Sequence, residues 1–419
     1  MKTPRVKIYL KFNIIIKSLF SNYNKSKLEL SNKLKKNLNK NYIEFFGMCR
    51  TGFIVILEYI KTKLPHKNEI IICSYNLEEM VDIAKLYKFN VRLVDIRKED
   101  GVVDINLIKN NSNEKTAAIL FTNMFNDYVQ INEIKKFCNS KDIILIEDCA
   151  IYFRNFHDQG VKRKYAGSYG DVSILSFGIM KNVSAIFGGA LLTSNQDIYN
   201  FSKEKFQQYK NFPKNLYFKK FVLFLLLKFF LSKYIYNLFF FYVIKISTKN
   251  KIRFLLNLIY PSLKFKPKKE IPNEYYSKIS NLSLKIVNNV LDDKKFEQDE
   301  IKRKKNNALY FSLLNTNKNV QLVKINDYNF QNFLDFPIIV KNKEKLVNYL
   351  FKKGLETRFH FYSNCEKYYN EQNNINSQYY DQNLICLPSH SEVTNEKIKN
   401  YCEEIKNFYI YERSSNNRI

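Results

Sequence analysis

Short apolar runs alternate with amphipathic stretches between residues 69 and 148. The runs are rich in Ile, Leu and Val, which favours buried strands, and the stretches between them repeat apolar positions at helical spacing. Strands separated by helices predict right-handed βαβ units, a mainly parallel sheet and thus an α/β fold. The expected strands are E-I-I-I-C-S-Y (69–75), N-V-R-L-V-D-I (90–96), A-A-I-L-F-T (117–122) and I-I-L-I-E-D (143–148), with helices near Leu77–Tyr87, Ile105 and Ile131–Cys138.

The last of these strands ends in two carboxylates, Glu147 and Asp148. In open α/β sheets, ligands bind beyond the carboxyl ends of the strands. The sequence therefore places Asp148 where a functional carboxylate is expected.

A second pattern lies between Asp171 and Asn195. It predicts a strand (172–177), a short connection that carries Lys181, and a glycine pair that opens a second apolar strand. A lysine among apolar and small residues loses its proton more readily than a solvated one, and Schiff-base chemistry needs the neutral amine. Alone, the stretch favours the interpretation of Lys181 as an ordinary lysine of a surface turn. With Asp148 it suggests a site for pyridoxal 5′-phosphate, which needs a lysine to carry it and a carboxylate to keep its pyridine nitrogen protonated.

These residues resemble motifs of the DegT/DnrJ/EryC1/StrS sugar aminotransferases. That family usually has E-D-A-A-Q and S-F-x-x-x-K-N-x-x-x-G-E-G-G, where this chain has E-D-C-A (147–150) and S-F-x-x-x-K-N-x-x-x-x-x-G-G (176–189). The spacing from Ser176 to Lys181 and on to the glycine pair is the same. The resemblance extends from about Tyr42 to Phe408 and includes L-P-S-H-S-E-V-T-N-E-K-I near the C-terminus. It implies the fold type I architecture, with a mainly parallel large domain, a C-terminal α/β small domain and a homodimer.

The resemblance also implies an activity and a set of site residues. The expected reaction transfers an amino group, with glutamate as the expected donor, to a keto-sugar nucleotide for polysaccharide or lipopolysaccharide synthesis. Lys181 and Asp148 are the expected catalytic residues. Family dehydratases carry histidine in place of the lysine, so Lys181 favours the aminotransferase branch. The other expected contacts are Cys49, Arg50 and Ser176 at the cofactor phosphate, Tyr75 on a face of the pyridine ring, and His360 towards the substrate.

Several positions depart from the family pattern. Met48-Cys49 replaces Ser-Gly in the expected phosphate loop, and Ile151 stands where Gln or His is usual. The remaining departures are Ile186-Phe187 for Gly-Glu, Tyr276 for an asparagine that reaches the neighbouring subunit, and Lys278 for arginine. These losses leave open an alternative, a non-catalytic, membrane-associated scaffold that keeps the aminotransferase fold. For Tyr75, a buried core tyrosine is an equally good interpretation.

An apolar insertion at about residues 214–262 separates the chain from the family pattern. Its segment 221–244 is long enough to span a bilayer, but it contains Lys228 and Lys233. Central lysines cost roughly 2.5–3.5 kcal/mol each, so we expect an interfacial or re-entrant hairpin whose flanking lysines face anionic headgroups. The alternative is a helical pair packed inside the protein or at a dimer interface. The first interpretation predicts a cytoplasmic protein associated with the inner face of the membrane.

Composition limits the other classes of protein to which the chain could belong. The formal net charge is +28, but the lysines are spread along the chain without a nucleic-acid-binding motif, so no nucleic-acid partner is expected. Seven irregularly spaced cysteines and four histidines argue against a disulfide framework and a metal site. We expect an N-terminal extension (1–40) of uncertain order, a large cofactor-binding domain (41–300) and a small C-terminal domain (301–419).

Overall fold

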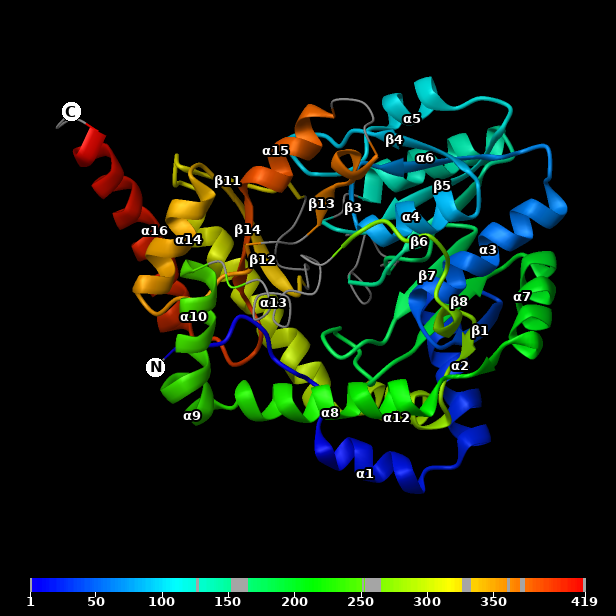
Figure 1. Cartoon of the computed structure of the whole chain (residues 1–419), viewed down its shortest axis with the longest axis horizontal. Helices are drawn as coiled ribbons and strands as arrows, with labels where there is room; N and C mark the ends of the chain where they lie inside the picture. Colours follow the sequence, from blue (N-terminus) through cyan, green and yellow to red (C-terminus); the bar gives the residue numbers. More distant parts are fainter. Residues whose placement is uncertain are drawn as a thin grey trace.

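The computed structural model describes residues 2–125, 128–151, 165–250, 252, 265–325, 333–359, 362–369 and 374–416. Two domains lie side by side (Figure 1), with the large sheet domain at the right of the view and the smaller C-terminal domain at the left. This arrangement confirms the predicted α/β fold, a mainly parallel large domain followed by a small one.

A nine-stranded sheet forms the large domain, in the order β4-β2-β5-β6-β7-β8-β1-β10-β9. Strands β4, β2, β5, β6 and β7 are mutually parallel, as predicted, and β8 and β1 are antiparallel to their neighbours. The strand bounds are β1 Tyr42–Phe46, β2 Glu69–Cys73, β4 Asn90–Val94, β5 Thr116–Thr122, β6 Ile144–Asp148, β7 Val172–Ser176, β8 Gly189–Thr193, β9 Lys210–Asn211 and β10 Ser277–Lys278.

Helices cover both faces of this sheet because the strands are apolar on both sides. Along β2, Ile71 packs into one core, whereas Ile70 and Ile72 pack into the other. This alternation follows the period of two in a strand. Helices α3 (Cys49–Lys63), α4 (Glu78–Leu86) and α7 (Gln196–Gln208) contribute to the second core; α2 (Tyr23–Leu38), α5 (Ile105–Asn111), α6 (Tyr128–Ser140) and α12 (Asn281–Leu291) contribute to the first.

The small domain is built on an antiparallel sheet in the order β11-β12-β14. Its elements are α13 (Lys294–Leu314), β11 (Val320–Leu322), β12 (Asp335–Val340), α14 (Lys343–Lys352), α15 (Ile375–Asn383), β14 (Leu384–Pro388) and α16 (Asn395–Asn416). A short strand, β13 (Ser363–Asn364), pairs instead with β3 (Tyr75–Asn76) of the large domain. This pairing ties the two domains together beside the predicted site.

The N-terminal extension, whose order the sequence left open, is folded. Helix α1 (Phe12–Phe20) and α2 pack against α12, and Leu30, Leu34 and Leu38 of α2 are fully buried. Their spacing of four residues marks one face of a helix. Ahead of α1, the first residues run between the insertion and the small domain, where His390 Nε2 lies 2.8 Å from the carbonyl oxygen of Pro4.

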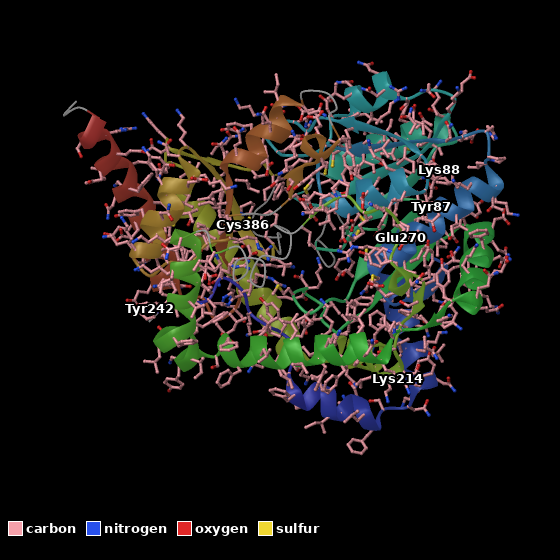
Figure 2. The ribbon with its side chains drawn as sticks, viewed as in Figure 1. Tyr87, Lys88, Lys214, Tyr242, Glu270 and Cys386 are labelled. Atoms are coloured by element: carbon pink, nitrogen blue, oxygen red, sulfur yellow. The ribbon has the colours of Figure 1, made fainter. Side chains whose placement is uncertain are left out.

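The insertion forms α8 (Lys214–Phe230), α9 (Lys233–Ile235), the π-helical turn η1 (Tyr236–Phe240) and α10 (Phe241–Lys249). Helix α8 runs from the large domain to the small one. Figure 2 shows Lys214, where α8 begins, and Tyr242 of α10, which lies beside the small domain. In the described part of the chain, no single helix is both long and apolar enough to cross a bilayer; α8 and the run 233–249 meet that test only together, bent by 66°.

Candidate active site

Lys181 sits in a tight connection between β7 and β8. Its backbone N–H donates to the carbonyl of Gly178 at 3.0 Å. The connection is fixed at both ends, since Phe177 accepts from Ala185 N–H at 2.8 Å and donates to Gly188 O at 2.9 Å. The lysine is therefore held on a defined backbone rather than on a free surface turn.

The electrostatic surroundings of Lys181 favour its neutral form. Burial lowers the pKa of its amine to about 8, against the opposing effect of the carboxylate of Asp148. The positive charges of Arg358 and Arg50 lower it further. A larger fraction of Lys181 is thus neutral near pH 7 to 8 than for a solvated lysine.

Glu147 and Asp148 have different surroundings because successive strand residues face opposite sides of the sheet. Glu147 accepts backbone N–H groups of Gly167, Tyr169 and Gly170 at 3.0, 2.8 and 2.6 Å, so its role is to hold that loop. Asp148 accepts from Ala150 N–H at 2.8 Å. Burial raises the pKa of Asp148, while Lys181 and Arg50 lower it. Asp148 is therefore the carboxylate on the Lys181 side, as the sequence predicted.

The N-terminus of α3 reaches the same place. A Cβ on Gly189 would lie 2.4 Å from the backbone carbon of Met48 and 2.5 Å from Cys49 N, so the glycine lets the two backbones cross. Met48, at the N-cap, provides no side-chain hydrogen bond to the first turn. The first N–H groups of α3 are thus available to an anion.

Arg50 lies on this first turn and forms an ion pair with Glu79. Its Nε is buried, and no described residue accepts a hydrogen bond from it. Burial, and then the charge of Asp148, raise the pKa of the Cys49 thiol well above its usual range, so Cys49 stays protonated. The structure thus brings Cys49 and Arg50, two of the three residues predicted at the phosphate, to the Lys181 site.

Ser176 ends β7, and its hydroxyl faces the same space as Lys181. A Cβ placed on Gly178 would lie 3.8 Å from both Ser176 Oγ and Lys181 Cγ. The two side chains therefore border one small volume beside the turn.

Tyr75 is enclosed by other rings. Its ring centroid lies 6.1 Å from that of Tyr362 and 5.7 Å from that of Tyr380, and its side chain is buried. This placement fits the core interpretation, and a contact with a pyridine ring stays a prediction. His360 lies outside the described residues.

The small domain adds two residues that sequence reasoning missed. Arg358 Nη1 forms an ion pair with Asp335 at 3.0 Å, and the charge of Arg358 lowers the pKa of Lys181. Burial, and next the charge of Asp148, raise the pKa of Tyr362. Both residues flank the predicted His360 in the sequence, which was the available signal.

The departures from the family pattern have structural partners. Tyr276 shares a hydroxyl contact of 3.0 Å with Tyr87, which in turn donates to Glu58 at 2.8 Å. Lys278 donates to the carbonyl of Gln207 at 3.2 Å, and Ile151 packs against the core. None of these contacts replaces a group at Lys181.

The residues present fit pyridoxal phosphate. Lys181 with its lowered pKa supplies an amine, and the buried carboxylate of Asp148 supplies a partner for the ring. The uncapped N-terminus of α3 and the buried Nε of Arg50, which has no hydrogen-bond partner among the described residues, supply donors for an anion. These groups come from β6, the β7–β8 turn and α3, at the carboxyl end of the parallel strands.

The fold and site fit the two-domain class of pyridoxal-phosphate-dependent aminotransferases. The model of the DegT/DnrJ/EryC1/StrS aminotransferase family matches residues 15–215 and 264–406, and the chain belongs to this family. The unmatched stretch between these ranges coincides with the predicted insertion. The family resemblance inferred from the motifs is thus confirmed.

Individual relatives match parts of the chain. GDP-4-keto-6-deoxy-D-mannose 3-dehydratase of Yersinia pseudotuberculosis is 27% identical over 179 residues, covering 39% of this chain and 44% of the relative. GDP-perosamine synthase of Escherichia coli O157:H7 is 23% identical over 166 residues, with the same two coverages. The chain therefore spans less than half the length of these curated relatives.

Solved structures match nearly the whole fold. The E. coli GDP-4-keto-6-deoxy-D-mannose-3-dehydratase with bound hydrated PLP has a TM-score of 0.71 at 17% identity, covering 96% of this chain and 99% of that chain. Helicobacter pylori PseC, an aminotransferase of pseudoaminic acid biosynthesis, has a TM-score of 0.69 at 15% identity, covering 97% and 99%. These likenesses confirm the fold type I architecture.

Proposed function

We propose that the protein is a pyridoxal-phosphate-dependent aminotransferase acting on a keto-sugar nucleotide for polysaccharide or lipopolysaccharide synthesis, with glutamate as amino donor. The observation that carries this proposal is Lys181, with a pKa of about 8, placed beside Asp148 and the N-terminus of α3. GDP-perosamine synthase and a dTDP-amino-sugar transaminase among the relatives support the substrate class.

Each residue has a proposed part. The α3 N-terminus, Arg50 and Ser176 hold the cofactor phosphate, and Asp148 keeps a proton on the pyridine nitrogen. When bound, pyridoxal phosphate supplies an electron sink for negative charge on the neighbouring substrate carbon. The Nζ of Lys181 takes the proton from that carbon, which a neutral amine can do and an ammonium cannot.

Dehydratases are also among the relatives, so the choice of the aminotransferase branch needs its own support. Lys181 supports amino transfer, because the resemblance places a histidine at this position in dehydratases. The alternative scaffold role rests on departures from the family pattern that leave Lys181 and Asp148 in place. These departures are Met48, Cys49, Ile151, Phe187 and Lys278.

Reductive trapping tests the cofactor assignment. The protein is incubated with pyridoxal phosphate, reduced with borohydride and mapped by peptide mass. Lys343 is a matched control, because burial also lowers its pKa to about 8 although it lies on α14 and donates to Asp381 O at 2.9 Å. We expect the adduct on Lys181 and its loss in Lys181→Ala but not in Lys343→Ala. An adduct shared between Lys181 and Lys343 would mean that pKa alone directs labelling, and no adduct on Lys181 would refute the enzyme proposal.

A homodimer and a membrane contact are part of the proposal. Sedimentation should show a dimer, and an active monomer with bound cofactor would contradict it. For the membrane, one side of the insertion and of α1 presents large apolar side chains. They are Phe12, Ile16, Leu19, Phe20, Phe218, Leu225, Leu226, Phe229, Tyr234, Leu238, Phe239, Tyr242 and Ile246. Large apolar side chains exposed on neighbouring helices support a contact with a membrane or another protein.

Deletion of the insertion is a poor test of the membrane contact, because Phe224, Tyr236, Phe241 and Ile244 are buried core residues. Three exposed positions should be changed instead, as Leu226→Gln, Phe229→Gln and Leu238→Gln. The matched control changes Ile301, Leu313 and Ile375, which are exposed elsewhere. We expect the first set to move the protein from the membrane fraction to the supernatant in salt-washed lysates. A wild-type protein that is already in the supernatant would refute the contact.

A further inference from the structure

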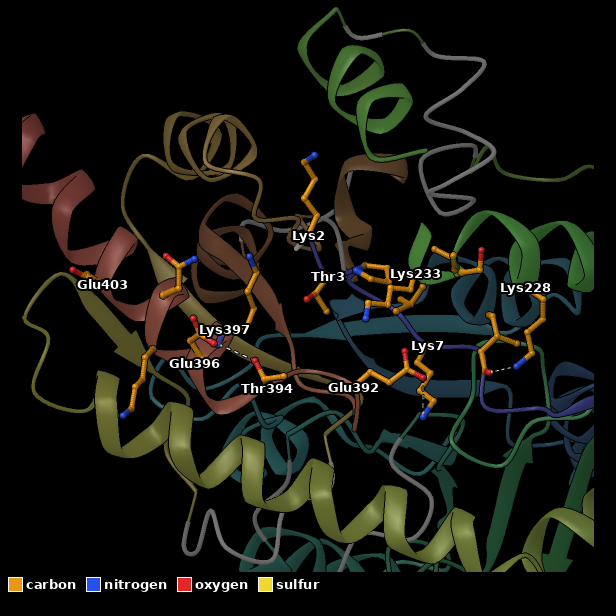
Figure 3. Close-up of a pocket in the computed structure, with 17 residues that line it drawn as sticks. Lys2, Thr3, Lys7, Lys228, Lys233, Glu392, Thr394, Glu396, Lys397 and Glu403 are labelled. Carbon is orange, nitrogen blue, oxygen red and sulfur yellow. Dashed lines mark hydrogen bonds and ion pairs between the residues drawn. The ribbon is translucent and has the colours of Figure 1, made fainter. Parts of the chain in front are cut away.

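A groove of about 1130 Å³ lies where the N-terminal segment, the end of α8 and the start of α16 meet. Figure 3 shows this groove, with Lys2, Lys228, Lys233 and Lys397 coming from three separate parts of the chain. None of its lining residues belongs to the Lys181 site. The groove therefore has no place in the proposed reaction.

Its lining is strongly basic. Three glutamates face six lysines, which are Lys2, Lys7, Lys228, Lys233, Lys397 and Lys399. Lys7 is neutralised, because it pairs with Asp299 and Glu392 at 3.2 Å each. By contrast, no described residue forms an ion pair with Lys233, Lys397 or Lys399. The six lysines thus outnumber the three glutamates of the lining, and three of the lysines form no ion pair with a described residue.

Two of these lysines are held in place by hydrogen bonds. Lys228 donates to the carbonyl of Ile8 at 3.0 Å, and Lys2 donates to the hydroxyl of Tyr242 at 3.0 Å. Burial lowers the pKa of Lys397, and the charge of Lys2 lowers it further, although Glu396 opposes this. A bound anion would relieve the repulsion between Lys2 and Lys397.

We propose that this groove binds a phosphate-bearing anion, and that the phosphate belongs to the headgroup of an acidic phospholipid. Two features support the lipid as its source. Tyr242, which holds Lys2, is itself 46% exposed, and the neighbouring Leu238 is 77% exposed. Exposed apolar side chains therefore lie next to a lysine of the groove, and this combination matches a lipid with a charged head and an apolar tail. The site is independent of the proposed aminotransferase activity.

The test compares two variants of the full chain. The groove variant changes Lys233, Lys397 and Lys399 to glutamine, which removes charge without breaking an ion pair among the described residues. The control variant changes Lys63, Lys109 and Lys115, three exposed lysines of the large domain, to glutamine. Both lose the same formal charge, so a difference between them reports the groove rather than net charge.

Binding is measured to inorganic pyrophosphate by calorimetry, and to phosphatidylcholine vesicles with and without phosphatidylglycerol by co-sedimentation. Each lysine close to an acidic membrane strengthens binding about fivefold, so the groove variant should lose roughly a hundredfold of the phosphatidylglycerol-dependent binding, and the control far less. Pyrophosphate should also displace wild-type protein from the acidic vesicles. Pyrophosphate binding without any preference for phosphatidylglycerol would overturn the lipid assignment and favour a soluble phosphate compound. Equal losses in the two variants, or no binding of either probe, would overturn the groove as a site.

Discussion

Replacing Arg5 with methionine should destabilise the folded chain by about 3–5 kcal/mol, the cost of breaking a buried ion pair. Arg5 Nε lies 3.2 Å from Glu356 Oε1, and the two side chains are only 5% and 1% exposed. The N–H of Arg5 and the hydroxyl of Tyr236 donate to Glu356 Oε2 at 2.9 and 2.6 Å. Methionine keeps an apolar stem of similar length, so the main loss is the charge that compensates the Glu356 carboxylate.

The sign of the pH dependence separates this cause from simple loss of packing. Burial raises the pKa of Glu356, and the charge of Arg5 opposes that rise. Without Arg5 the folded-state pKa rises further above the unfolded value. The carboxyl then contributes its full stability below the unfolded pKa, and this contribution is lost as pH rises through the folded pKa. The difference in unfolding free energy between wild type and Arg5→Met should therefore widen as pH rises above the unfolded-state pKa of glutamate.

Urea unfolding followed by circular dichroism measures both effects. Lys345→Met is a control in the same domain, because its pair with Glu412 spans 3.7 Å and Lys345 is 74% exposed; about 0–1 kcal/mol is expected there. The double variant Arg5→Met/Glu356→Gln should recover part of the loss, since no charge remains buried. A loss below 1 kcal/mol for Arg5→Met, or a loss that does not change with pH, would refute the reasoning.

Three further outcomes concern the candidate active site. The rate of reductive trapping at Lys181, measured by mass spectrometry, should rise with pH and reach half its maximum near pH 8, because burial lowers the pKa of the amine to that value. A midpoint above pH 10 would contradict a lowered pKa for Lys181. Asp148→Asn removes the charge that raises the pKa of Lys181, so the midpoint of trapping should move to lower pH. The same change should lower kcat by about a hundredfold or more. An unchanged midpoint and an unchanged kcat would show that another carboxylate acts on Lys181 and the cofactor ring. Gly189→Ala should lower the free energy of unfolding in urea by about 1–3 kcal/mol and weaken cofactor binding, because the added Cβ would meet the backbone of Met48. A cofactor affinity equal to that of the wild type, measured by absorbance, would show that the two backbones can move apart.

Local patterns predicted the sheet and the approach of Lys181 to Asp148. The alternation along 69–148 predicted the parallel strands because each strand there is apolar on both faces, as Ile70, Ile71 and Ile72 show. The approach of Lys181 to Asp148 was predictable because each residue lies in a short motif at the end of a strand, and their catalytic roles stay a prediction. The family match at 15–215 and 264–406 confirms the origin of those motifs.

Residues whose place depends on distant contacts were harder to predict. Arg358 and Tyr362 reach Lys181 and Asp148 from the small domain, and no local pattern marks such a meeting. The first residues seemed featureless because their partners lie in the last quarter of the chain: Arg5 pairs with Glu356, and Pro4 with His390. In the insertion, Phe224 is buried in the core and Leu238 is exposed. Both residues are apolar, so apolar character alone could not predict which positions are buried.

The contacts of the N-terminal segment also set an order of events during synthesis. The ribosome releases residues 2–8 first, but their partners Glu356 and His390 emerge after most of the chain has been made. Domains generally fold as units in the order in which they are translated. The large domain can therefore assemble early, while the amino terminus waits beside the insertion with Arg5 unpaired. Closing these contacts is then a late step, and a chain that stops before Glu356 leaves Arg5 and Pro4 without these two partners.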